Sequence, residues 1–162
     1  MAGVRRTTLE DRPTGTLPWS MIFMYGAGAG LVGVAAMTVG EKIEQFFTKR
    51  PSSNVPAWTL AKLIGARPMP GAELFKYNMA MHYGQGAAAA VVRGIMAYNG
   101  VRGPFADFMF MGIRLLIDQT LENATGVGAL PWTWPVSEQV VDLLHKFVFA
   151  FVTGYVADRL IQ

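Results

Sequence analysis

Long uncharged segments alternate with short polar ones along this chain of 162 residues. The first uncharged segment runs from Trp19 to Gly40 and is followed at once by Glu41. At about 1.5 Å per residue, a helix of that length crosses the roughly 30 Å hydrocarbon core of a bilayer. We therefore predict a first transmembrane helix over residues 19–40.

Three further segments have the length and apolar character of membrane spans, and Gly and Pro residues separate them. The third of the four spans is the least apolar, because it contains Asp107 and Arg114. A shorter segment, Trp58–Ile64, is closed by Gly65 and predicts a short interfacial helix between spans 1 and 2. The pattern predicts an all-α polytopic membrane protein, an antiparallel four-helix transmembrane bundle. Its spans are expected at about 19–40, 74–97, 104–120 and 136–160.

Composition supports a membrane protein. Hydrophobic residues make up 52% of the chain and charged residues 15%, against about 25% charged in soluble domains. Residues 1–18 are mostly polar and predict a solvated tail before a single membrane domain over 19–162. The net charge of +3 is spread along the chain, so no nucleic-acid partner is expected. Basic residues are shared evenly between the two predicted sides, which leaves the orientation in the membrane open. The choice between a cell inner membrane and an organelle membrane is open as well.

Glycines recur within the first two spans. Residues 28–33 read Gly-Ala-Gly-Leu-Val-Gly, a literal G-x-G-x-x-G, but a dinucleotide loop needs a preceding strand and alternating strands and helices. Long apolar segments follow instead, so we interpret the glycines as surfaces for close helix packing in lipid. Arg93 lies near the end of the second span, where we expect it to snorkel to the interface. The expected packing residues are Gly26, Gly30, Gly33, Gly84 and Gly86.

Ionisable residues gather at one end of the predicted bundle. An antiparallel arrangement brings the end of the first and third spans beside the beginning of the second and fourth. Helical spacing places several of these residues on shared faces: Glu138, Asp142 and His145 follow an i, i+4, i+7 pattern. Ionisable groups at membrane depth are costly and mark functional-site candidates. The predicted polar cluster consists of Glu41, Glu44, His82, Arg114, Asp118, Glu138, Asp142 and His145.

Three interpretations of this cluster stay open. It is a structural layer of hydrogen bonds in which Arg114 neutralises Asp118 or Glu41, or a proton or small-solute site that uses two histidines titrating near neutral pH, or a metal site. The metal reading rests on Asp142-x-x-His145, which imitates the Glu-x-x-His of di-iron bundles without supplying the two such motifs of that design. No cofactor is predicted. The weak metal-ligand candidates are Glu41, His82, Asp142 and His145.

Several short motifs resemble the YagU-like family of small integral membrane proteins. They are Met37-Thr38-Val39-Gly40-Glu41, Lys49-Arg50-Pro51-Ser52-Ser53, His82 with Gly84 and Gly86, the segment Gly126–Pro135, and His145 ahead of Gly154-Tyr155. The resemblance implies a four-helix membrane fold and implies little about activity. The third span, with Asp107, Phe110 and Arg114, departs from the apolar run that the family leads us to expect.

These patterns favour an integral membrane protein whose polar His/carboxylate cluster handles protons or a small polar solute. The alternative is a non-catalytic scaffold or accessory subunit that binds partner membrane subunits or further copies of itself through its small-residue faces. A membrane metalloenzyme is the outside alternative. The sequence identifies no catalytic residue, and the lipid bilayer is the one partner that all three readings share.

Overall fold

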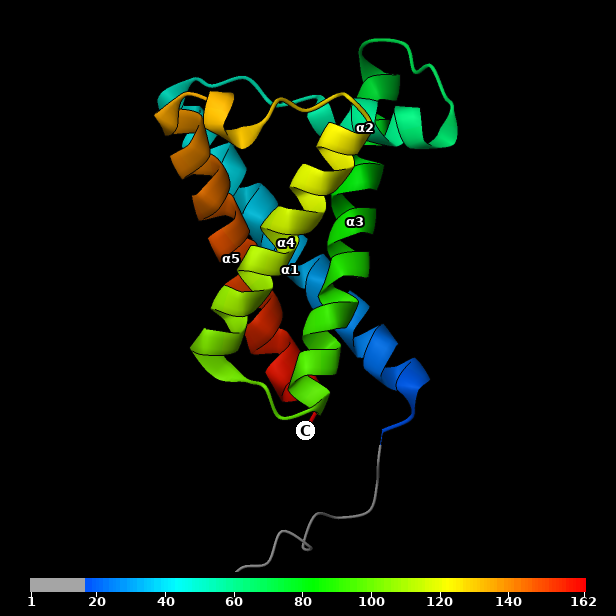
Figure 1. The fold of residues 1–162 in the computed structure, drawn as a ribbon, viewed down its shortest axis with the longest axis vertical. Coiled ribbons are helices and arrows are strands. Elements are labelled where there is room, and N and C mark those ends of the chain that lie inside the picture. Colours follow the sequence, from blue (N-terminus) through cyan, green and yellow to red (C-terminus); the bar gives the residue numbers. More distant parts are fainter. Residues whose placement is uncertain (1–16) are drawn as a thin grey trace, which may run out of the picture.

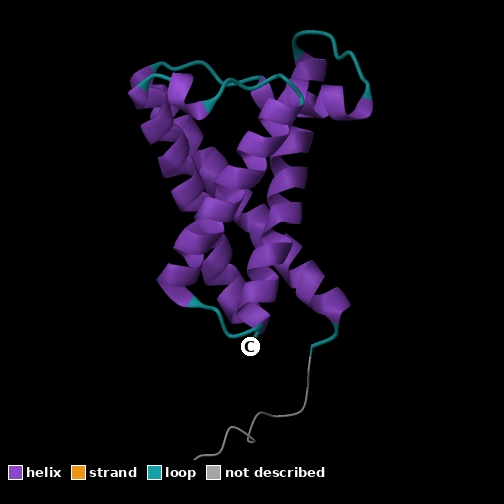
Figure 2. Cartoon of the chain, viewed as in Figure 1, coloured by secondary structure: helices purple, strands orange, loops and turns teal. Residues whose placement is uncertain are grey.

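The computed structural model describes residues 17–162, which form five α-helices and a single 3₁₀ turn with no strand among them (Figures 1 and 2). The all-α class predicted from the sequence is therefore observed. All but two residues of the predicted tail over 1–18 lie outside the described residues. The elements are α1 (Trp19–Thr48), α2 (Val55–Ile64), α3 (Ala72–Tyr98), α4 (Gly103–Ala124), η1 (Pro131–Thr133) and α5 (Val136–Leu160).

The long helices begin where the sequence pattern predicts, but two of them continue further. α1 does not stop at Gly40: it runs through the charged residues after it and ends at Thr48, where Lys49 adopts a left-handed conformation with φ 59°. Pro51 follows and cannot continue the helix. α4 likewise extends beyond residue 120 to Ala124. These extensions carry acidic side chains past the predicted spans toward one end of the bundle.

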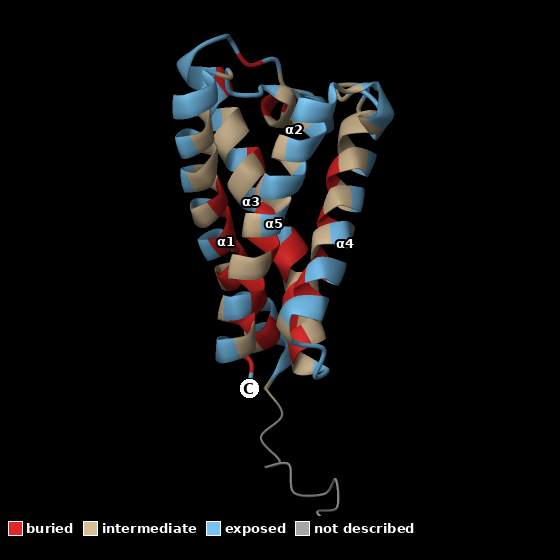
Figure 3. Cartoon of the chain, turned by 90° about the vertical axis from the view of Figure 1, so that its left-hand side faces the viewer, coloured by how far each residue is buried: buried red, intermediate tan, exposed pale blue. Residues whose placement is uncertain are grey.

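The four long helices are antiparallel neighbours. α1 packs on α3 and on α5, α4 packs on α5, and α2 lies against α3. The helices are close together at the end that holds the C-terminus and diverge toward the end that carries α2 (Figure 3). The divergence leaves room for polar side chains at the wider end.

Glycines allow α1 and α3 to approach closely. A Cβ atom built on Gly30 would lie 2.4 Å from Ala90 Cβ, and one built on Gly26 would lie 3.0 Å from the Ala90 carbonyl oxygen. On α3, a Cβ on Gly86 would lie 2.2 Å from Val34 Cγ2. Real Cβ atoms do not tolerate such distances, so the two backbones meet only because these positions lack side chains.

Gly33 packs against α5 rather than α3, whereas Gly84 packs against no other helix among the described residues. A Cβ on Gly33 would lie 2.1 Å from Thr153 Oγ1 and 2.9 Å from the Phe149 carbonyl oxygen. Gly84 is exposed, with nothing within 4 Å of a built Cβ, so it does not pack against another described helix of this chain. It lies two positions from Gly86, and at about 100° per residue the two cannot face the same neighbour.

Many large apolar side chains lie on the outside of the bundle: Met24, Phe47 and Leu116 are 70%, 76% and 68% exposed. The buried positions, shown in red in Figure 3, hold alanines, glycines and charged groups besides apolar residues such as Phe110 and Phe149. Within residues 17–162, two helices, α1 and α5, are long and apolar enough to cross a membrane by length and composition.

Arg93 does not reach the interface, contrary to the sequence prediction. Its side chain is fully buried and pairs with Asp107 of α4 and Asp158 of α5, at 2.9 Å and 2.8 Å from Nη2. The prediction considered only the position of Arg93 near the end of its helix. Two carboxylates from other helices make the buried position more favourable than the interface.

Candidate functional site: a polar cavity at one end of the bundle

A cavity of about 450 Å³ lies at the wide end of the bundle. All five α-helices or the loops that join them contribute to its wall. Of the eight predicted cluster residues, seven line it: Glu41, His82, Arg114, Asp118, Glu138, Asp142 and His145. The eighth, Glu44, lies beside the cavity without lining it. The antiparallel arrangement therefore brings together residues that are more than 100 positions apart in sequence.

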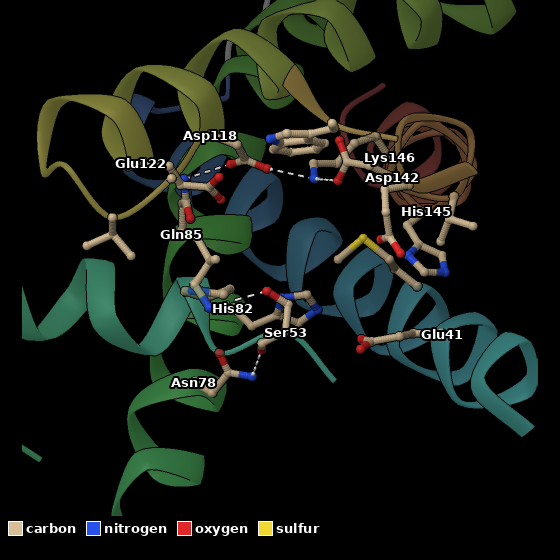
Figure 4. A pocket seen from close by; sticks show the side chains of 18 of the residues that line it. Glu41, Ser53, Asn78, His82, Gln85, Asp118, Glu122, Asp142, His145 and Lys146 are labelled. Carbon is tan, nitrogen blue, oxygen red and sulfur yellow. Dashed lines mark hydrogen bonds and ion pairs between the residues drawn. The ribbon is translucent and has the colours of Figure 1, made fainter. Parts of the chain in front are cut away.

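Asp118 is the centre of an ionic network. Its Oδ1 accepts a hydrogen bond of 2.7 Å from Gln85 Nε2 of α3 and lies 3.2 Å from Arg114 Nη2 on its own helix. Its Oδ2 lies 3.1 Å from Lys146 Nζ of α5. Lys146 also pairs with Asp142 at 2.5 Å (Figure 4). One carboxylate thus joins three helices, and it is only 4% exposed.

A second set of ion pairs closes one side of the cavity. Arg50, in the loop after α1, lies 3.1 Å from Glu44 and 3.2 Å from Glu138. Asn78 of α3 holds the same loop, because its amide donates to the Ser53 carbonyl oxygen at 3.2 Å and accepts from the Ala57 backbone N–H at 3.1 Å. These contacts fix the loop between α1 and α2 over the ends of the helices.

Glu41 and the two histidines line the cavity without bonding to one another. Glu41 accepts a hydrogen bond of 2.8 Å from Gln45 of its own helix. His82 Nε2 is buried and has no hydrogen-bond partner within residues 17–162. The weak metal-ligand candidates share the cavity, but no three His, Asp or Glu side chains in the described part of the chain form a group that could hold a metal ion.

Glu122 is the cavity carboxylate whose pKa burial moves furthest. It lies in the last turn of α4, beyond the predicted span 104–120. Burial raises the pKa of Glu122 from 4.5 to about 7; Lys146 opposes the shift, while the nearby carboxylates Asp118 and Asp142 add to it. No ion pair to Glu122 is found among residues 17–162. This side chain therefore titrates near neutral pH, well above the ordinary range of a carboxyl group.

The charges that line the cavity do not balance. Three cationic side chains, Arg50, Arg114 and Lys146, each have a carboxylate partner within the network. Two lining carboxylates, Glu41 and Glu122, remain without a cationic partner among the described residues. Figure 4 shows them on opposite sides of the cavity, with His82 between them. The carboxylates of Glu41 and Glu122, whose charges no cation compensates, can each accept a proton.

Sequence reasoning left four members of the site out of the predicted cluster, one of which is Glu122, four residues after Asp118 on α4. Gln85, Lys146 and Arg50 were not among the predicted residues, although each contacts one that was. Lys146 follows Asp142 by four residues, and this i, i+4 spacing of opposite charges was a readable signal. Gln85 had no such local signal, because its partner on α4 is distant in sequence. Arg50 lies in a loop, six residues from Glu44 and far from Glu138, so helical spacing gave no signal for it.

Comparison of the chain with protein-family models, with curated proteins and with solved structures finds no significant match.

Proposed function

We propose that the protein is an integral membrane protein whose four long helices all cross the bilayer. Three of the helices expose bulky apolar side chains: Phe23 and Leu31 on α1, Phe108 and Leu116 on α4, and Leu144 on α5. These side chains have favourable contacts with lipid and unfavourable contacts with water. The charges that make α3 and α4 less apolar, among them Arg93, Asp107 and Arg114, face inward, so they do not oppose insertion.

Cysteine labelling distinguishes four spans from two. The chain has no cysteine, so single introduced cysteines report cleanly on the side of the membrane they face. Ser52→Cys and Leu130→Cys lie in loops at the cavity end, and Val101→Cys lies in the turn between α3 and α4. With four spans, an impermeant maleimide added to sealed vesicles labels Ser52→Cys and Leu130→Cys from one side and Val101→Cys from the other. If only α1 and α5 cross, all three positions label from the same side.

We further propose that the cavity binds protons and, with them, a small cationic or polar solute. The observation that carries this proposal is the pair of uncompensated carboxylates, Glu41 and Glu122, beside two histidines. A cavity in which every cation is already paired has no net attraction for an anion, whereas its spare carboxylates favour a positive charge. The volume of about 450 Å³ suits a small molecule.

A proton titration tests the role of Glu122. We expect the purified protein in detergent to take up a proton at Glu122 as the pH falls from 8 to 6, and Glu122→Gln to lose this uptake. Because the pKa of Glu122 is raised in the fold, its contribution to stability is present at low pH and is lost as the pH rises through about 7. Glu122→Gln is therefore expected to raise Tm at pH 8 and to leave it nearly unchanged at pH 5.

Glu73→Gln is the matched control for this titration. Glu73 lies in the first turn of α3, outside the cavity, and accepts a hydrogen bond from the Met69 backbone N–H. The control should keep the proton uptake of the unmodified chain. Equal uptake by Glu122→Gln and the unmodified chain between pH 6 and 8 would contradict the proposed proton site.

An accessory subunit remains the second candidate, because the last turns of α1 present an apolar groove to the outside. Val39, Ile43, Phe46 and Phe47 line it, and all four are more than half exposed. A partner helix would bury this surface. Light scattering of the protein purified in mild detergent measures the mass directly: one copy without other subunits disfavours this role.

A further inference from the structure

A second ionisable cluster lies at the other end of the bundle from the cavity. It consists of Arg93 of α3, Asp107 of α4 and Asp158 of α5, joined by the ion pairs of 2.9 Å and 2.8 Å described above. Arg93 is fully buried, and the side chains of Asp107 and Asp158 are 8% and 20% exposed. Among the described residues, the buried Arg93 Nη1 and Thr153 Oγ1 have no hydrogen-bond partner. The cluster therefore has one carboxylate more than it has cations, and unused polar atoms.

The two clusters lie in line along the same helices. On α4, Asp107 precedes Arg114 by seven residues, which is two helical turns and about 10 Å along the axis on the same face. On α5, Thr153 follows Lys146 by the same interval. The α4 pair joins a residue of the second cluster to a residue of the network around Asp118, and Thr153 lies on α5 between Lys146 of that network and Asp158 of the second cluster. The polar groups form a path through the bundle with one interruption.

Two aromatic rings fill that interruption. Phe110 of α4 and Phe149 of α5 are fully buried, with ring centroids 5.6 Å apart. Val34 and Ala90 complete the same apolar layer from α1 and α3. On the cavity side, the Arg114 guanidinium carbon lies 5.2 Å from the centroid of the Phe149 ring. The apolar layer thus lies directly against the cavity network.

We propose that the bundle passes protons between its two ends through these two clusters in series, and that Phe110 and Phe149 form the closed barrier between them. The proposal rests on the proposed function of the cavity and adds a second site, a route and a barrier.

The charges of the second cluster suit a proton. Protonation of one carboxylate converts the set of one guanidinium and two carboxylates to zero net charge, which is favourable in a low-dielectric interior. The only bond formed or broken is the O–H bond of the carboxylic acid, as the proton arrives from water on one side and leaves to water on the other. α1 contributes no charge here, since it is uncharged from Trp19 to Gly40.

The barrier requires that the rings exclude water. Groups about 10 Å apart exchange protons only through bridging water molecules, and an apolar constriction blocks conduction by dewetting. A smaller side chain at either ring position leaves a space that water can fill, because Arg114, Lys146 and Thr153 offer it hydrogen-bond partners.

Proton flux into liposomes of neutral lipid, driven by a pH gradient and read with an entrapped pH dye, tests the barrier. We expect Phe110→Ala to raise the flux per protein about tenfold or more over the unmodified chain, and Phe149→Leu to raise it less. Phe149→Leu keeps more of the volume and decides the outcome if Phe110→Ala does not purify as a folded protein. Phe108→Ala is the matched control, because Phe108 lies on the outer face of the same helix and is 51% exposed. Unchanged flux in the folded ring variants, or an equal rise in Phe108→Ala, would overturn the barrier.

A second variant tests the route. Asp107→Asn in the Phe110→Ala background should return the flux to near the level of the unmodified chain, because Arg93 then neutralises Asp158 and the second cluster has no spare carboxylate to take up a proton. Flux that stays high would overturn the second site, since protons would then cross by water alone. The Glu122 titration separates this inference from the proposed function: proton uptake at Glu122 with no flux in the ring variants contradicts the route only, whereas the loss of both contradicts the cavity site as well.

Discussion

Arg93→Met is expected to destabilise the protein by about 3–5 kcal/mol, the cost of removing one partner from a buried ion pair. Methionine fills a similar volume, so lost charge and not lost packing dominates the effect. Asp107 and Asp158 would remain as two carboxylates, one of them 8% exposed, without their cation. In a chain of this size, such a loss lowers Tm by about 10 °C or more.

Thermal unfolding in detergent, followed by circular dichroism or by loss of the monodisperse peak, measures this change. Arg159→Met is the control: Arg159 is exposed, and its contacts are with Tyr155 of the preceding turn, so Tm should change little. Asp107→Asn should cost less than Arg93→Met, because Arg93 keeps Asp158 as its partner. If Arg93→Met unfolds at the temperature of the unmodified chain, the cluster does not stabilise the bundle.

The polarity pattern predicts the helices, because uncharged runs bounded by Gly and Pro are strong local signals. The four long helices begin within two residues of the predicted spans, and α2 ends at Ile64, where the sequence places the end of its short helix. Where the helices end at the cavity is less readable: α1 continues for eight residues past Gly40, since charged residues do not by themselves stop a helix. Local sequence thus specifies the elements better than their polar ends.

The candidate site is predictable as a neighbourhood but not as a set of contacts. Antiparallel connectivity is enough to bring Glu41, His82, Asp118 and His145 to one cavity. It does not give the rotation of each helix, which decides that Lys146 bonds Asp118 while His145 does not. Arg93 shows the same limit, because its partners lie 14 and 65 positions away in the chain. Contacts between helices depend on packing that single-helix patterns do not encode.

Small residues carry much of that packing information, and Gly30 is the position where the consequence is largest. A Cβ there would lie 2.4 Å from Ala90 Cβ and 2.7 Å from the Gly86 carbonyl oxygen, neither of which can move without moving α3. Gly30→Val must therefore push α1 and α3 apart or rotate one of them. Overpacking of a core costs about 1–3 kcal/mol, and contact with backbone places this variant at the upper end of that range or above.

Gly28→Val is the matched control, since it makes the same substitution on the same helix, two residues away, where nothing lies within 4 Å of a built Cβ. Both variants alter helix propensity equally, so the difference in Tm between them isolates the contact between α1 and α3. Gly30→Val is expected to unfold at a clearly lower temperature than Gly28→Val. Because the displacement of α1 also moves Glu41, Gly30→Val should change the proton titration of the cavity as well. Equal Tm values for the two variants would mean that α1 and α3 are not in backbone contact at Gly30, and the bundle would then need a different packing of its first helix.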